Sequence, residues 1–194
     1  ETGIGPIKAT GSNVVRLQLR ADTSAVLLQA ALDRIVENDM IAMLMLWEDE
    51  DKITCTDDPT FISEAIDDLW LGDWLAVLAQ EKYQAHLMIN MANEWGPLNI
   101  FNASSKSYSD YIDYYKSFIA KFRSAGFKVP LVIDAPHCGQ DYYAFLGGRA
   151  NELLVADTES NLILSSYGYG SVWNSGEKLR RNLNLLSAEG VSFV

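Results

Sequence analysis

The segment His86-Leu87-Met88-Ile89-Asn90-Met91-Ala92 is an almost unbroken apolar run, and Asn93-Glu94-Trp95 follows it directly. Strands that are covered on both faces of a parallel sheet show this near-continuous apolar character, whereas half-solvated strands alternate. Polar groups at the carboxyl ends of such strands lie on the rim where barrel folds build their sites. The segment therefore predicts a buried parallel strand with Glu94 at its functional end.

The same unit, a short apolar run followed by a polar loop and an amphipathic stretch, repeats along the chain. The other apolar runs are Val14–Leu19, Ile41–Trp47, Val129–Asp134, Leu162–Tyr167 and Val191–Val194. Strands that alternate with helices predict an α/β fold with about six parallel strands, either an open doubly wound sheet or part of a closed (β/α)8 TIM barrel. No Gly-x-Gly-x-x-Gly or Walker loop follows the first run, so a nucleotide-binding open sheet has no support.

The amphipathic stretches carry the start and stop signals of helices. The first is Thr23–Asn38 with Asp22 or Thr23 as its cap, and the second opens at Pro59 and is interrupted by Leu71-Gly72-Asp73 before Trp74–Gln80. The remaining three run from Ser107 or Ser109 to Gly126, over Tyr143–Leu154 with a break at Gly147-Gly148, and over Ser175–Ser187 before Gly190. One helix is therefore expected after each of the first five strands.

The chain of 194 residues has 26 acidic and 15 basic side chains, and its formal charge of −11 offers no positive surface for phosphate backbones or anionic lipid. No apolar run approaches the roughly 20 residues that span a bilayer. Nucleic acid and membranes are therefore not expected as partners. Residues 1–3, Glu-Thr-Gly, resemble the remnant of a cleaved secretion signal, so residues 4–194 are expected to form one domain of a secreted protein. Asn102-Ala103-Ser104 is a glycosylation sequon.

Polar and aromatic residues follow four of the predicted strands, at Trp47-Glu48, Asn93-Glu94-Trp95, Asp134–Asp141 and Tyr167–Tyr169. In a barrel these groups converge on one rim. A carboxylate beside aromatic rings has its charged form disfavoured, so its pKa rises and it can protonate a leaving glycosidic oxygen. Glu94 is the candidate for this role, and Asn93 could orient a sugar hydroxyl. Trp47, Trp95 and Trp173 offer flat faces for sugar rings, with plain packing as the alternative for each.

Met88–Gly96 resembles the strand of glycoside hydrolase family 5 that ends in Asn-Glu, above all in its endo-β-1,4-mannanase branch. Arg123–Gly126 followed by Leu131–Gln140 continues the match at the spacing of that branch. Asn13–Arg16 is similar to the family's strand-two arginine segment, and Asn161–Ser165 to its sixth strand. Four matching strands in order make the resemblance specific. It implies a partial (β/α)8 barrel that runs from the second to about the seventh strand.

The resemblance implies that Glu94 is the acid/base of a retaining glycoside hydrolase that acts on β-1,4-linked mannan or glucan. It also implies substrate contacts from Arg16, Asn93, Trp47, Trp95, His137, Gln140 and Tyr169. Nothing in the sequence names a cofactor, and His86 and His137 are too few and too far apart to predict a metal site.

The sequence departs from the family pattern at two active-site histidines. Met45–Glu48 stands where the family has Glu-Val-His-Asp, and Tyr167-Gly168-Tyr169 stands where it has His-Met-Tyr. The family's nucleophile, a second glutamate after strand seven, would come just after Val194, and a retaining glycosidase needs both carboxylates. Hydrolysis by this chain alone is therefore not expected. The acidic loop that starts at Glu48 is expected to be a solvated turn.

Two functions remain open at this point. The intact Asn93-Glu94 pair favours a glycoside hydrolase, and the loss of both histidines favours a degenerate barrel that binds glycan or a protein partner without turnover. Cys55 and Cys138 follow strand ends on the same face, so they either pair or remain free thiols. A barrel short of two strands has open sheet edges, so a homodimer is expected unless a terminal segment such as Ile4–Ala9 covers the opening.

Overall fold

The computed structural model describes residues 3–48, 52–98, 101, 105–190 and 192–193. Its strands are β1 (Val14–Leu19), β2 (Ile41–Leu46), β3 (Leu87–Asn90), β4 (Leu131–Asp134) and β5 (Leu162–Ser165). Its α-helices are α1 (Ile4–Ala9), α2 (Ala25–Glu37), α3 (Pro59–Ala65), α4 (Leu75–Leu78), α5 (Ser105–Ser124), α6 (Arg149–Ala156) and α7 (Gly176–Ser187). A π-helix, η1 (Ile66–Asp73), and two 3-10 helices, η2 (Glu81–His86) and η3 (Tyr142–Phe145), complete the described elements.

The strands form one parallel sheet whose order, β1-β2-β3-β4-β5, repeats their order along the chain. A doubly wound sheet reverses its strand order at a switch point, whereas a barrel adds each strand beside the previous one. The partial (β/α) barrel is therefore confirmed. β3 and β4 pair only at Ile89↔Leu131 and Asn90↔Val132, so the last two residues of β3 lie beside the first two of β4 and the strands are staggered.

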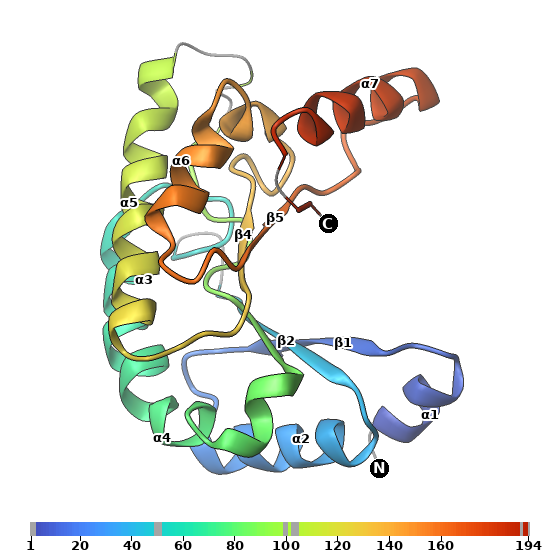
Figure 1. The fold of residues 1–194 in the computed structure, drawn as a ribbon, viewed down its shortest axis with the longest axis vertical. Coiled ribbons are helices and arrows are strands. Elements are labelled where there is room, and N and C mark those ends of the chain that lie inside the picture. Colours follow the sequence, from blue (N-terminus) through green and yellow to red (C-terminus); the bar gives the residue numbers. More distant parts are fainter. Residues whose placement is uncertain (1–2, 49–51, 99–100, 102–104, 191, 194) are drawn as a thin grey trace.

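The helices are distributed unequally over the two sides of the sheet (Figure 1). Helices α2 to α6 lie along its outer side, α1 and α7 stand at the two ends of the arc, and none of the described helices covers the inner side. The register places Arg16, Met43 and Met88 in one row on that inner side. Arg16 is exposed there and the two methionines are half-buried, so the inner side of the arc is open.

The first two helical segments differ from the prediction in their caps and in their continuity. Ser24, not Asp22 or Thr23, caps α2, because its Oγ accepts from the Leu27 amide at 3.2 Å. Thr23 Oγ1 is instead occupied by the Arg20 amide at 2.9 Å. Pro59 does open α3, but the predicted break at Leu71-Gly72-Asp73 is the end of the π-helix η1, which leads through Trp74 into α4.

The predicted helix over Tyr143–Leu154 is two helices. Gly147 and Gly148 separate η3 from α6 and have φ angles of +68° and +88°, a conformation that favours glycine. Helix α1 was not expected as a helix. Its Lys8 Nζ donates to the Asp39 carbonyl at 2.9 Å, just before β2, so α1 lies near the amino end of the sheet and not over the rim.

Arg123, near the end of α5, joins the amino ends of β4 and β5. Its Nε and Nη2 lie 2.5 and 2.9 Å from the two carboxylate oxygens of Asp157, and both side chains are nearly inaccessible to solvent. Its Nη1 also donates to the carbonyls of Phe127 and Val129, each at 2.9 Å. This clamp fixes the turn that precedes β4 to the turn that precedes β5.

Several sequence features lie at or beyond the limits of the described residues. In the run Val191–Val194, Phe193 forms a parallel bridge with Leu164, and Ser192 O accepts from the Leu164 amide at 2.9 Å, which places these two residues beside β5. Residues 1–2, the sequon at 102–104 and residues 49–51 of the acidic loop lie outside the described part. No helix in that part combines the length and apolarity needed to cross a membrane.

Candidate functional site

Asp134, the last residue of β4, is the centre of a polar network at the carboxyl ends of the strands. Its Oδ2 accepts from the Glu94 amide at 3.0 Å and from the Tyr167 hydroxyl at 2.9 Å. Arg16 Nη2, reaching across from β1, lies 3.5 Å from the same oxygen and also contacts the Tyr167 hydroxyl. Asp134, at the end of β4, therefore links β1 with the segments that follow β3 and β5 through one buried oxygen.

Asn93, just beyond β3, is held by the same network. Its Oδ1 accepts from Arg16 Nη2 at 3.2 Å and lies 3.3 Å from the Tyr167 hydroxyl oxygen. Its Nδ2 donates to Thr54 Oγ1 at 3.3 Å, and its backbone amide donates to the Leu46 carbonyl at 2.8 Å. The orientation of this amide side chain is therefore fixed from both ends.

Glu94 projects from this network with its two oxygens in different surroundings. Oε1 lies 2.7 Å from the Tyr169 hydroxyl oxygen, and Oε2 lies 3.7 Å from the Sγ of Cys55. Burial raises the pKa of Glu94 above its usual value, and the Tyr169 hydrogen bond opposes that shift. A half-buried carboxyl with a raised pKa keeps a proton at a higher pH than a solvated one, so it is suited to proton donation.

Cys55 and Cys138 form a disulfide bond beside Glu94. Cys55 lies between β2 and α3, and Cys138 follows β4, so the bond crosses over the end of β3. The Cys55 amide donates to the Glu94 carbonyl at 3.1 Å, and the Tyr169 hydroxyl lies 2.6 Å from the Cys138 carbonyl oxygen. Of the two alternatives for these cysteines, the structure therefore has the paired one.

Four residues at this rim adopt left-handed backbone conformations that side chains other than glycine rarely take. Their φ angles are +58° at Cys55, +54° at Glu94, +52° at His137 and +52° at Cys138. Each such residue costs on the order of 1 to 3 kcal/mol and persists only where its surroundings hold it. The backbone at the rim is thus fixed in an unfavourable shape around the Glu94 carboxyl.

The tryptophans are placed differently from one another. Trp95 is 1% exposed, stacks on Tyr111 at 6.1 Å between ring centroids, and donates from Nε1 to the Asp58 carbonyl. Both faces of its ring are therefore unavailable to a sugar, and it packs in the core in place of the expected contact. Trp47 is half-buried at the rim with the guanidinium of Arg20 over its ring at 5.1 Å.

His137 and Gln140 lie in the turn that follows β4. Burial lowers the pKa of His137, and its ring meets Phe101 at 4.3 Å between centroids. Gln140 is half-buried and its carbonyl accepts from the Nε1 of Trp173 at 3.2 Å. Both residues are near the rim, and their contacts with a substrate remain predictions.

Glu48 corrects one expectation about the acidic loop. Its side chain is 3% exposed, and its Oε1 accepts from the Ala21 amide at 2.6 Å. Its Oε2 lies 3.5 Å from Arg20 and 3.8 Å from Lys52. Glu48 is therefore an internal link between the loops after β1 and β2, because these partners compensate its burial, and it is not part of a solvated turn.

Two network residues were missed from the sequence. Tyr167 stands where the family pattern has a histidine, so only Tyr169 was counted as a match, yet the Tyr167 hydroxyl bonds three partners. Thr54 had no sequence signal. Among the described residues, ligand spacing for a metal occurs at Cys55, Glu94 and Cys138, but both sulfurs are in the disulfide, which leaves Glu94 as the usable ligand.

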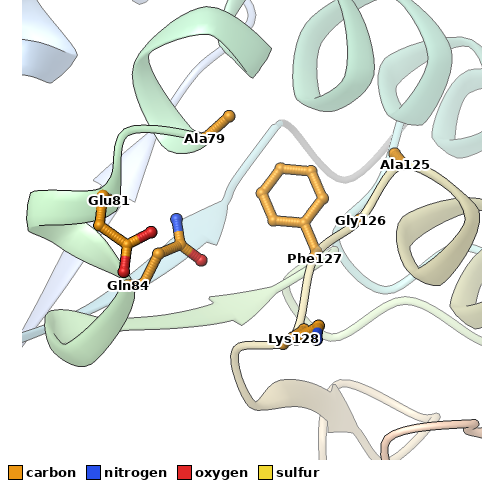
Figure 2. A pocket seen from close by; sticks show the side chains of 7 residues that line it. All are labelled: Ala79, Glu81, Gln84, Ala125, Gly126, Phe127 and Lys128. Carbon is orange, nitrogen blue, oxygen red and sulfur yellow. The ribbon is translucent and has the colours of Figure 1, made fainter.

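A hollow of about 420 Å³ lies away from this site, between the segments that precede β3 and β4. Its wall includes Glu81, Gln84 and Phe127, and Figure 2 shows the first two facing the ring of Phe127 across it. The hollow is at the amino end of the sheet, opposite the rim. Substitutions in this hollow can therefore serve as controls for substitutions at the rim.

No family model matches the chain. A mannan endo-1,4-beta-mannosidase of Streptomyces lividans is 30% identical over 197 residues, which cover 98% of this chain and 48% of that protein. The catalytic domain of a mannanase from Streptomyces sp. SirexAA-E superimposes with a TM-score of 0.80 at 27% identity, over 97% of this chain and 58% of that one. The chain is therefore similar to these mannanases in both sequence and fold.

A β-mannanase of Thermomonospora fusca, solved as a mannohexaose complex, shares the fold with a TM-score of 0.78 at 23% identity. It is covered over 61% of its length, against 97% of this chain. The chain therefore spans about half the length of the Streptomyces lividans protein and about three fifths of these two solved structures. The resemblance to glycoside hydrolase family 5, drawn from the segments around Glu94 and Asp134, is confirmed as a likeness in sequence and fold.

Proposed function

We propose that this chain forms the acid/base part of a site that binds β-1,4-linked mannan or glucan, with Glu94 as the proton donor. One observation carries the proposal. Glu94 is half-buried at the carboxyl end of β3 with its pKa raised by burial, and it lies beside the fixed network of Arg16, Asn93 and Tyr167. A carboxyl in such surroundings protonates a glycosidic oxygen as the bond to it breaks.

The network gives its members separate roles. Asn93 already uses both ends of its amide, so a sugar hydroxyl would meet it in one orientation. Arg16 neutralises the buried Asp134 and keeps its own guanidinium at the open inner side of the sheet. Tyr169 is nearly half exposed, and its hydroxyl contacts Glu94. These groups would hold a sugar ring against the proton donor.

Two other carboxylates near this rim, Asp134 and Glu48, are closed to solvent. Asp134 Oδ2 accepts from three donors while its Oδ1 has no partner among the described residues, and Glu48 is tied to Ala21, Arg20 and Lys52. A nucleophile has to attack the anomeric carbon about 5 Å from the acid, and neither group is available to do so. We therefore expect this chain alone to bind oligosaccharide without hydrolysing it.

The second candidate is a non-catalytic barrel that binds glycan. The observation in its favour is that Trp47 and Tyr167 occupy the positions of the family's histidines and are built into other contacts. Arg20 lies over the Trp47 ring, and the Tyr167 hydroxyl is shared among Arg16, Asn93 and Asp134. In this case the protonation state of Glu94 would not affect binding.

Calorimetric titration with mannohexaose and cellohexaose at several pH values distinguishes the two candidates. If Glu94 donates to the sugar, affinity falls as the pH rises through its pKa, and Glu94→Gln, which mimics the protonated acid, removes that dependence. Asn93→Ala should weaken binding about tenfold, about 1.4 kcal/mol. Glu81→Gln at the hollow is the charge-matched control. Affinity that is independent of pH favours the non-catalytic barrel, and no binding contradicts both.

Two further properties belong to the same proposal. Secretion is supported by the Cys55–Cys138 bond, because half-exposed disulfides persist in oxidising compartments. Assembly as a homodimer is supported by β1, an edge strand of the described sheet with Val14, Arg16 and Gln18 exposed, because such an edge is a template for pairing with a second copy.

A further inference from the structure

The disulfide holds the backbone on both sides of Glu94. Cys55 comes from the segment after β2 and Cys138 from the segment after β4, and β3, which carries Glu94, lies between these strands. The Cys55 amide binds the Glu94 carbonyl at 3.1 Å. Since Cys55, Glu94 and Cys138 all have left-handed backbone angles, the bond helps to keep three unfavourable conformations together.

The bond also determines what the Glu94 carboxyl meets. Cys55 Sγ lies 3.7 Å from Oε2, and a disulfide sulfur carries no hydrogen to donate. A free thiol at the same place would be a donor, and a hydrogen bond to a carboxylate favours its charged form. The oxidised sulfur therefore leaves Oε2 without the donor that a reduced cysteine would provide.

The Tyr169 hydroxyl is shared between Glu94 and the disulfide loop. Its oxygen lies 2.7 Å from Glu94 Oε1 and 2.6 Å from the Cys138 carbonyl oxygen, and both are acceptors when Glu94 is charged. One hydroxyl proton can serve only one of them. If Glu94 is protonated, it donates to the tyrosine oxygen and the tyrosine donates to Cys138. Both short contacts are then satisfied, so the geometry matches the neutral acid.

We propose that the Cys55–Cys138 disulfide is a positioning element that keeps the Glu94 carboxyl protonated, and that its reduction by a dithiol shifts Glu94 toward the carboxylate. In the exchange the dithiol loses two electrons and two protons and becomes a cyclic disulfide. The protein S–S bond breaks and gives two thiols. Both cysteines are half-exposed, so a small dithiol can reach them. Only the consequence for catalysis rests on the function proposed above.

Two effects of reduction act in the same direction. The new Cys55 thiol can donate to Oε2, and release of the two loops admits water to a carboxyl whose pKa is now raised by burial. The charged and titratable groups facing Glu94 are Arg16 from β1, Asp134 from β4 and Tyr169 from the segment after β5. Ordinary thiols titrate at about pH 8.5 and are neutral below pH 7, so reduction adds no charge beside Glu94 in that pH range.

Carbon-13 NMR of protein labelled at the glutamate side-chain carboxyl tests the proposal without any glycan. Glu94→Gln assigns the signal, and its titration midpoint is measured in the oxidised and the dithiothreitol-reduced protein. We expect the midpoint to fall by about one pH unit on reduction. Since no activity is measured, this result is independent of whether the chain acts on polysaccharide.

Two single variants separate the effect of the new thiol donor from the effect of releasing the loops. They also test the proposal if the reduced wild-type protein unfolds. Cys138→Ser leaves a Cys55 thiol beside Oε2 and should reproduce the full fall. Cys55→Ala removes the bond together with the sulfur that lies 3.7 Å from Oε2 and leaves only the Cys138 thiol, so its midpoint should fall less. Circular dichroism confirms that each protein is folded. A midpoint that stays the same or rises in the folded reduced protein, or in folded Cys138→Ser, overturns the proposal.

Discussion

Two tyrosines one turn apart on α5 differ in whether their hydroxyls are paired. Tyr111 and Tyr115 are both buried, and burial raises the pKa of each well above its usual value. The Tyr111 hydroxyl donates to the Asp134 carbonyl at 2.6 Å. Within the part of the chain that the structure describes, the Tyr115 hydroxyl has no hydrogen-bond partner.

Replacing each tyrosine with phenylalanine should therefore give different results. Tyr111→Phe leaves a buried carbonyl without its donor and should lower the free energy of unfolding by about 1 to 2 kcal/mol. Tyr115→Phe removes an unpaired hydroxyl and should be neutral or slightly stabilising, within about 0.5 kcal/mol. Urea unfolding of both variants measures the contrast. An equal loss in the two proteins would show that Tyr115 has a partner as well.

The site residues were predictable where a strand end carried a polar side chain. Arg16, Asn93, Glu94 and Tyr169 were expected at one end of the sheet, and the structure brings them together. Tyr167 and Thr54 were missed because their importance lies in what their hydroxyls contact across the rim, which no spacing along the chain encodes. Trp95 was misplaced because an aromatic residue beside Glu94 can turn outward or into the core.

Among the elements, the connection between β4 and β5 depends on one side chain. Arg123 binds both oxygens of Asp157 and two carbonyls before β4 in a region that is closed to solvent. The Arg123 bond holds the pKa of Asp157 below its usual value, against the effect of burial. With the bond from Nη2 to the Asn161 carbonyl at 3.2 Å, Arg123 donates five hydrogen bonds, which is more than a lysine can supply.

Arg123→Ala should lower the free energy of unfolding by about 3 to 5 kcal/mol, since it leaves Asp157 buried without its partner. Arg123→Lys should restore only part of that loss. Because folding lowers the pKa of Asp157, its ion pair with Arg123 stabilises the protein at pH values above the ordinary aspartate range. That stabilisation is lost as the pH falls through the pKa that Asp157 has in the folded protein. Thermal unfolding at neutral and acidic pH tests this, because the difference between wild type and Arg123→Ala should shrink in acid. A constant difference would contradict the role of Asp157.

The periodicity of the sequence predicted where the helices lie, but not the type of each helix or its cap residue. The five predicted helical segments all contain helices, because apolar spacing reflects the face that is buried against the sheet. The π-helix η1 continues through Gly72, which looks like a break in sequence. Three adjacent residues, Asp22, Thr23 and Ser24, are all suitable N-caps, so the sequence alone does not select one of them. The backbone geometry at the start of α2 makes Ser24 the cap.

For the whole molecule, the edge strand β1 predicts the state of association. We expect a homodimer at micromolar concentration, and static light scattering across a dilution series measures it. Val14→Lys adds a charge to the exposed edge and should shift the protein toward the monomer. Val26→Lys, at an exposed position of α2, is the control and should leave the mass unchanged. A monomer at every concentration would rule out pairing through this edge.

The clamp of Arg123 and the rim around Glu94 lie at opposite ends of β4. That strand has four residues, so the two are separated by about 13 Å. Substitutions more than about 7 to 10 Å apart usually contribute to stability independently. Substitutions at rim positions such as Trp47 and Tyr167 should therefore leave the stabilising contribution of the Arg123 clamp unchanged. Such independence is consistent with a fold that matches a Streptomyces mannanase with a TM-score of 0.80 at only 27% identity.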